Sequence, residues 1–94
     1  MSRIPPAPRP YKARNRPNPV RLPEKLLRIR KRFGLSQTGM IRVVIPDADD
    51  SSRARISQYE RGSRVPSLLE VLNYAKFAKV SMEVLVDDNQ DLPF

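Results

Sequence analysis

Apolar side chains recur at helical spacing along residues 22–33 and form a single stripe of Leu22, Leu26, Ile29 and Phe33. Residues three or four positions apart lie on one face of a helix, so this stretch is predicted to be an amphipathic helix. Pro23 suits the first helical position, and Gly34 is a natural C-terminal stop. The basic residues of the stretch lie off the stripe: Lys25, Arg28, Lys31 and Arg32.

The next helix is predicted from its cap and its apolar spacing. Ser36 can cap the N-terminus, and Pro46 ends the helix. The residues that should face inward are Met40, Ile41 and Val44. Gly39 costs this helix about 1 kcal/mol relative to alanine, so the helix should depend on tertiary packing.

A third helix follows the loop that the composition of residues 46–51 indicates. Ser52 is its expected N-cap, and the helix should run from Arg53 to about Arg61 before Gly62 stops it. Its inward residues are Ile56 and Tyr59. Polar and basic side chains make up the rest of its surface.

Two further helices complete the pattern. Ser67 and Glu70 have the spacing of a capping box for a helix that ends near Lys79. The residues expected to be buried there are Leu69, Leu72, Tyr74 and Ala75. Ser81 caps a short last helix containing Met82 and Leu85. The sequence therefore predicts an all-α fold of five short helices.

Composition divides the chain into three parts. Residues 1–21 hold six of the ten prolines, six basic side chains and no acidic one, which predicts a flexible, basic, Pro-rich arm. Residues 22–88 form the predicted helical domain, and residues 89–94 a flexible C-terminus. Of the net charge of +8, only +2 belongs to residues 22–94. This asymmetry favours a polyanionic partner, most often nucleic acid.

Several classes of function are disfavoured by the residues that the chain lacks. Without cysteine or histidine it has no disulfide, no thiolate metal site and neither the commonest general base nor the commonest zinc ligand. A calcium loop starting at Asp47 fails, because Ser52 and Gln58 stand where glycine and glutamate are needed. No apolar run is long enough to cross a membrane. We expect a cytoplasmic, nucleoid-associated protein without enzymatic activity, metal or cofactor.

Four motifs together resemble the Xre family of phage-repressor and Cro-type helix-turn-helix proteins: Phe33-Gly-Leu-Ser-Gln37, Ile56-Ser-Gln-Tyr-Glu-Arg-Gly62, Arg64-Val-Pro-Ser67, and Ala75-Lys76 with Val80-Ser81. The resemblance covers roughly residues 22–88. It implies a five-helix domain whose second and third helices form the DNA-binding unit, with the third helix in the major groove. The chain departs from the family in a connection about five residues longer before Ile56, in the bulky Ile41, and in Lys79, where glycine is common.

The residues predicted to contact bases lie on the third helix: Arg53, Ala54, Arg55, Ser57 and Gln58. Arginine can donate two parallel hydrogen bonds to guanine, glutamine can bond adenine in a similar way, and alanine can contact a thymine methyl group. For Arg53 and Gln58 the alternatives are a phosphate contact or simple solvation. For Arg55 the alternative to a base contact is a phosphate contact, because Arg55 neighbours the inward Ile56.

A second set is predicted to contact the DNA backbone: Ser36, Gln37, Arg61, Arg64 and Ser67. Ser36 and Gln37 begin a helix, whose free amides and positive dipole end favour phosphate, and the resemblance gives Gln37 a phosphate-side role. The two arginines flank Gly62, and solvated charge is their alternative. The resemblance also implies a partly buried ion pair between Arg30 and Glu60, which should set helix packing and not touch DNA.

In the arm, Arg14-Asn-Arg16-Pro17 resembles the Arg-Gly-Arg-Pro core of an AT-hook, with asparagine in place of glycine. Arg14 and Arg16 are therefore predicted arm contacts, through the minor groove or through phosphates alone. A solubilising extension that touches nothing is the alternative.

The leading hypothesis is a sequence-specific, DNA-binding transcriptional regulator, and repression is the expected mode of regulation. It should act as a homodimer, because one short helix reads too few base pairs to compete with genomic DNA. The last helix and the C-terminal segment are the expected dimer contact. The alternatives are an adaptor or antitoxin-like protein that mainly binds a protein partner, and RNA binding through the arm.

Overall fold

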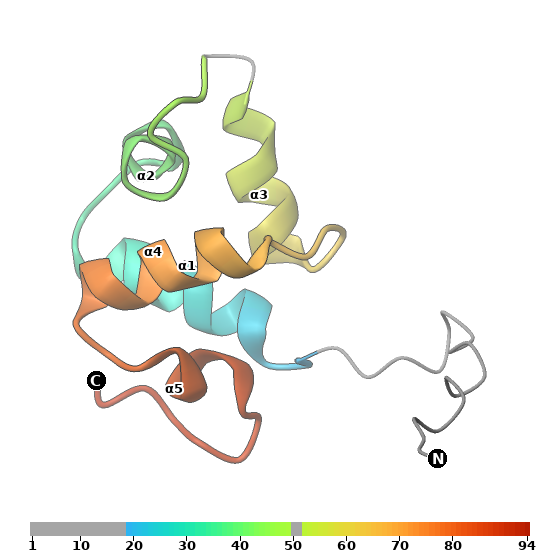
Figure 1. The fold of residues 1–94 in the computed structure, drawn as a ribbon, viewed down its shortest axis with the longest axis vertical. Coiled ribbons are helices and arrows are strands. Elements are labelled where there is room, and N and C mark those ends of the chain that lie inside the picture. The colour runs from blue at the N-terminus through green and yellow to red at the C-terminus, as the bar shows by residue number, and fades with distance from the viewer. Residues whose placement is uncertain (1–18, 50–51) are drawn as a thin grey trace, which may run out of the picture.

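The computed structural model describes residues 19–49 and 52–94, and in this part of the chain every regular element is a helix. The helices are α1 (Leu22–Arg32), α2 (Gln37–Val44), α3 (Arg53–Arg61), α4 (Leu68–Ala78) and α5 (Met82–Val86) (Figure 1). The all-α prediction is thus confirmed for the described residues. The arm predicted over residues 1–21, including Arg14 and Arg16, lies outside them apart from its last three positions.

Three of the expected helix caps are present. The hydroxyl of Ser36 accepts a hydrogen bond from the Gly39 amide at 3.0 Å, and Ser81 caps α5 in the same way. Ser67 and Glu70 form the full capping box of α4. Each of these serines has an extended backbone, which lets its side chain fold back over the first helical turn.

The expectation for Ser52 was wrong, because its side chain makes no capping bond. Its backbone is already helical, at φ −83° and ψ −2°, so the hydroxyl does not reach back to the second or third amide. The amide of Ser52 instead donates to the carbonyl of Asp49 at 3.0 Å. This backbone hydrogen bond, and not a side-chain cap, precedes the first turn of α3.

Two helix ends adopt the left-handed conformation. Gly62 ends α3 at φ 78°, where a Cβ atom would also stand only 3.3 Å from the ring of Pro23. Lys79 ends α4 at φ 60°, which is strained for a residue with a side chain. The strain expected at Lys79 is therefore present.

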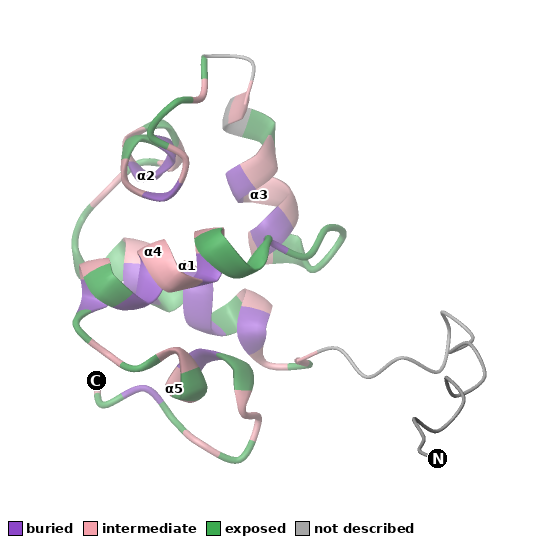
Figure 2. Ribbon diagram, in the orientation of Figure 1, coloured by how far each residue is buried: buried purple, intermediate pink, exposed green. Residues whose placement is uncertain are grey.

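The core lies where α1 meets α3, α4 and α5, and where α2 meets α3 and α4 (Figure 2). It contains the inward residues predicted for the first three helices other than Phe33: Leu22, Leu26, Ile29, Met40, Ile41, Val44, Ile56 and Tyr59. Figure 1 looks along α2 while α3 runs across the view, so these two helices cross steeply. In Figure 1, α2 ends and α3 begins at the same end of the molecule, and Ile41 packs in the core.

Two side chains that were predicted to be buried are exposed, and a third, Leu72, is only half-buried. Leu69 is 64% exposed, because α4 buries the face made by Val71, Tyr74, Ala75 and Ala78 and turns its first turn outward. Phe33 lies beyond the end of α1 and is also exposed, with its ring edge-on to Phe77 at 4.8 Å between centroids. In both places the apolar spacing was regular, but neighbouring helices cover only part of the stripe.

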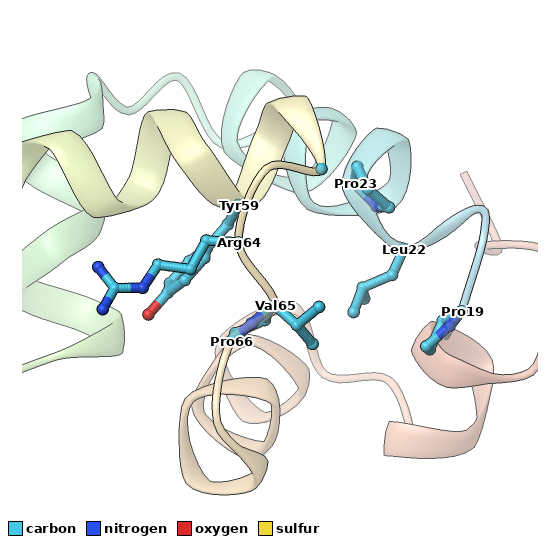
Figure 3. A pocket seen from close by; sticks show the side chains of 8 residues that line it. Pro19, Leu22, Pro23, Tyr59, Arg64, Val65 and Pro66 are labelled. Atoms are coloured by element: carbon cyan, nitrogen blue, oxygen red, sulfur yellow. The ribbon is translucent and has the colours of Figure 1, made fainter. Parts of the chain in front are cut away.

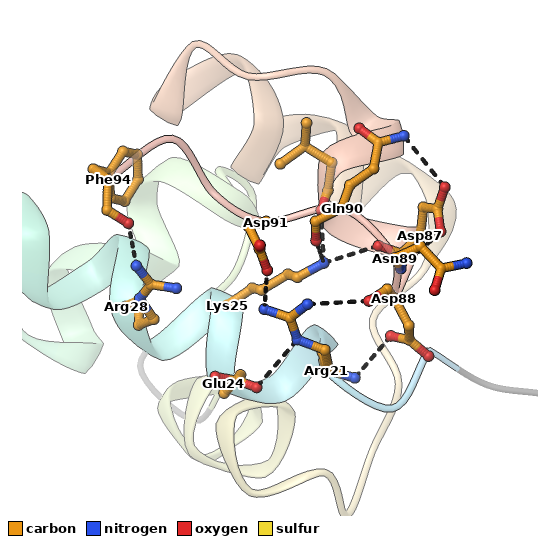
Figure 4. A network of polar contacts seen from close by, with 11 residues as sticks. Arg21, Glu24, Lys25, Arg28, Asp87, Asp88, Asn89, Gln90, Asp91 and Phe94 are labelled. Atoms are coloured by element: carbon orange, nitrogen blue, oxygen red, sulfur yellow. Dashed lines mark hydrogen bonds and ion pairs between the residues drawn. The ribbon is translucent and has the colours of Figure 1, made fainter.

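The segment expected to be a flexible C-terminus packs against α1 instead (Figure 4). Leu92 is buried in the core. Both oxygens of the Asp88 carboxylate accept backbone amides, from Val20 and Arg21, at 2.9 Å. Arg21 also forms an ion pair with Asp91 at 2.5 Å. These bonds satisfy the free amides before α1 with a carboxylate, which also suits the positive end of the helix dipole.

Lys25 lies at the centre of this contact and is fully buried, although its position off the apolar stripe did not predict burial. Its ammonium group donates to the carbonyls of Val84, Asp87 and Gln90 at 2.7–3.0 Å. The three bonds join α1 to the end of α5 and to the chain beyond it. The C-terminal segment is therefore part of the folded domain.

Candidate nucleic-acid interface

The helix α3 has two distinct faces. Ile56 and Tyr59 are buried, and they hold the helix on the core. The opposite side carries the exposed Ala54 and Arg61 and the half-exposed Ser57 and Gln58, at spacings of three, four and seven residues. These four side chains therefore form one surface of α3 that faces away from the core, which we call the α3 face. Arg53 begins the helix, but its side chain lies outside the described residues.

Arg55, a predicted base or phosphate contact, turns toward α4. Its guanidinium pairs with the carboxylate of Glu70 at 3.2 Å. The second oxygen of Glu70 accepts the hydroxyl of Tyr59 at 2.5 Å and the amide of Ser67 at 2.9 Å. Arg55 is therefore engaged in fixing α3 against α4, and the structure does not bring it to the α3 face.

The electrostatics of this contact follow from the same bonds. Burial acts to raise the pKa of Glu70, but hydrogen bonds from Tyr59 and Ser67 and the charge of Arg55 outweigh it and lower that pKa. Burial, together with the bond to Glu70, raises the pKa of Tyr59. These shifts favour the ionised carboxylate of Glu70 and the neutral phenol of Tyr59.

The implied ion pair of Arg30 and Glu60 is present. Two guanidinium nitrogens meet the two carboxylate oxygens at 2.6 and 3.0 Å, and the side chains are only 16% and 5% exposed. Gln37 joins them, because its amide Nε2 donates to Glu60 at 3.3 Å. One carboxylate therefore links the end of α1, the start of α2 and the last turn of α3. Gln37, to which the resemblance gives a phosphate-side role, is here part of that link.

Two arginines contact other side chains of the α3 face: Arg61, which belongs to it, and Arg64 in the turn that follows α3. A guanidinium N–H of Arg61 donates to the hydroxyl of Ser57, one turn earlier on the helix. Nη1 of Arg64 lies 3.4 Å from the side-chain oxygen Oε1 of Gln58. Both arginines are exposed. The structure thus brings two predicted backbone contacts against two predicted base contacts.

The remaining predicted backbone contacts are the serines at two helix starts. Ser36 and Ser67 are exposed, and each hydroxyl already accepts an amide of its own helix. They are therefore capping residues in this structure.

A small pocket lies between the turn after α3 and the start of α1 (Figure 3). Its walls come from both segments: Pro19, Leu22, Pro23, Tyr59, Gly62, Arg64, Val65 and Pro66. Pro19 is the first described residue, so the root of the basic arm stands beside the turn that carries Arg64. The arm root consequently lies beside the turn that follows α3.

Sequence reasoning missed three features of this region. Glu70 was recognised only as a capping residue, although it also binds Arg55 and Tyr59. Lys25 was not expected to be buried. The hydroxyl of Tyr74 is buried and makes no hydrogen bond to any described residue, and burial raises its pKa. The contacts of Glu70 and Lys25 and the burial of Tyr74 depend on residues from other helices, so no local pattern signals them.

Comparisons with protein-family models, with curated proteins and with solved structures gave no match to this chain. Among the described residues, no helix combines the length and the apolar composition that crossing a bilayer requires. The same residues contain no cluster of three acidic side chains that could hold a metal ion.

Proposed function

We propose that this protein is a sequence-specific DNA-binding regulator that reads the major groove with α3. The observation that carries the proposal is the α3 face, with Ala54, Ser57, Gln58 and Arg61 turned away from the core on a single helix. The major groove, about 12 Å wide, admits a helix, and side chains of these types bond or touch base edges there.

The contacts that fix α3 to the other helices support the same function. The Glu60 link ties its last turn to α1 and α2, and the Glu70 contact ties its middle to α4. Side chains that discriminate bases must be held to within fractions of an ångström, which rigid elements achieve better than loops. A helix held at two points meets that requirement.

The charge of the chain supports a polyanionic partner. Residues 1–21 carry an excess of six positive charges, and their root lies beside the turn after α3. Cations on the arm would attract phosphates without regard to sequence, while the α3 face supplies the preference. A homodimer on two half-sites about one helical turn apart would give the specificity that one helix lacks.

Selection of bound sequences from random duplexes tests this function. We expect the parent protein to enrich a two-part site, and Gln58→Ala to lose the preference at one position in each half. Lys76→Ala is the control, because Lys76 is exposed on α4 and the substitution removes the same number of non-hydrogen atoms from a different helix. Equal binding of all duplexes by the parent would refute the proposal.

A second candidate function rests on an exposed apolar group at the start of α4. Val65, Leu68 and Leu69 are 53%, 77% and 64% exposed and stand close together in sequence. Apolar side chains grouped at the surface often mark protein contacts. An adaptor of this kind would bind one protein partner in a fixed ratio and show no operator preference, which the same selection would reveal.

A further inference from the structure

The contacts between arginines and the α3 face bear on which base the face reads. Gln58 carries one acceptor, Oε1, and a donor group, Nε2. Oε1 faces the guanidinium of Arg64, 3.4 Å away. The hydroxyl oxygen of Ser57 is engaged in the same way by Arg61. On both residues the acceptor is therefore turned to an arginine, and the donor hydrogens remain for a ligand.

This arrangement changes the expected partner of Gln58. To bond adenine in the usual bidentate way, glutamine must accept the N6 amino group with its oxygen and donate to N7. Arg64 already donates to this oxygen, which leaves it one of its two lone pairs, and the other N–H groups of Arg64 are donors without any acceptor. A positive guanidinium also disfavours the approach of an amino group.

Guanine fits a surface whose acceptor oxygens already face arginines and whose donors are free. Its major-groove edge offers two acceptors, N7 and O6, and no donor. The amide N–H of Gln58 and a free N–H of Arg64 would meet both. We propose that Arg64 is a specificity-determining residue that turns Gln58 from an adenine reader into a guanine reader. This inference rests on the proposed DNA-binding function.

The test is duplex selection at low ionic strength with four proteins: the parent, Gln58→Ala, Arg64→Ala and Arg32→Ala. The position at which Gln58→Ala loses preference identifies the base that Gln58 contacts. We expect guanine there in the parent. Arg64→Ala should raise the adenine-to-guanine ratio at that position by roughly 5- to 150-fold, the range that corresponds to about 1–3 kcal/mol of discrimination.

Arg32→Ala is the matched control, because it removes the same charge from α1, where Arg32 lies over the ring of Phe94. It should keep guanine. Adenine in the parent, or guanine retained by Arg64→Ala, would overturn the inference and leave the proposed function intact. Loss of all selection by Arg64→Ala alone would also overturn it, since Arg64 would then be an essential contact of its own. No preference in the parent would overturn both.

Discussion

Lys25 shows how a single charged residue can organise a small domain. Three main-chain carbonyls surround its ammonium group and replace the water that it loses on burial. Its four-carbon stem crosses from α1 to the chain after α5 (Figure 4). The residue therefore joins the first helix to the C-terminal segment.

Replacing Lys25 with methionine should lower the free energy of unfolding by about 2 kcal/mol. The apolar stem is kept, but three carbonyls lose a charged donor, and each such bond contributes about 1.5–3 kcal/mol before the relief of burying a charge is deducted. Lys31→Met, at an exposed position of the same helix, should change the free energy by less than about 0.5 kcal/mol. Urea denaturation measures both, and equal effects would refute the assigned role.

Lys79 is a position where a substitution should stabilise the protein. Because it ends α4 at φ 60°, Lys79→Gly should relieve strain and raise the free energy of unfolding by about 1 kcal/mol. The same substitution at Lys76, inside the helix, should lower it by about 1 kcal/mol. Thermal unfolding of the two variants compares them directly, and a destabilised Lys79→Gly would contradict the strain.

At the scale of elements, two carboxylates determine how α3 is presented. Glu60 holds its last turn to Arg30 and Gln37, and Glu70 holds its middle through Arg55 and Tyr59. Both networks lie on the side of α3 away from the α3 face. Any movement of the face relative to the domain would therefore require breaking charged contacts that are largely shielded from water.

The Glu70 contact predicts a sensitivity to acid. Its pKa is lowered in the folded protein, so the unfolded chain binds a proton more readily. The stabilisation is complete above the ordinary pKa of about 4.5 and is lost as the pH falls from there through the lowered value. Glu70→Gln should therefore be less stable than the parent at pH 7, and the difference should shrink below pH 4.5.

Urea denaturation between pH 7 and pH 3 measures this difference. Glu83→Gln, at an exposed position of α5, is the control and should follow the parent at every pH. A constant difference between Glu70→Gln and the parent over the whole range would show that the contact does not depend on the carboxylate charge.

At the scale of the molecule, charge is unevenly divided. The described domain is nearly balanced, and much of its acidity is used internally, as where Asp88 and Asp91 bind the root of the arm. Hydrogen bonds from the amides of Arg21 and Val20 lower the pKa of Asp88. The excess positive charge belongs to residues that precede this root in the sequence, and Pro19 at the root lines a pocket with the turn after α3. We thus propose that the arm attracts DNA phosphates and that the α3 face selects the base sequence.

Neutralising the arm should separate these two contributions. Replacement of Arg3, Arg9, Lys12, Arg14 and Arg16 by glutamine removes five positive charges. The slope of log affinity against log salt should become shallower by up to roughly 4.5, because each phosphate contact contributes about 0.9. The base preference should not change.

The control keeps the charge, with lysine at all five positions, and should retain the parent slope. Titration of a selected duplex at several salt concentrations gives both values. If the glutamine variant lost its base preference as well, the arm and not the α3 face would be reading the DNA.

The sequence by itself determined what depends on near neighbours along the chain. The apolar period set the five helices, serines set three of their starts, and Gly62 set the end of α3, because these signals act within one or two turns. Tertiary structure decided the rest. Contacts between segments far apart in sequence decided that Leu69 is exposed, that Arg55 pairs with Glu70, and that Lys25 and Leu92 are buried. Local spacing carries no information about such contacts.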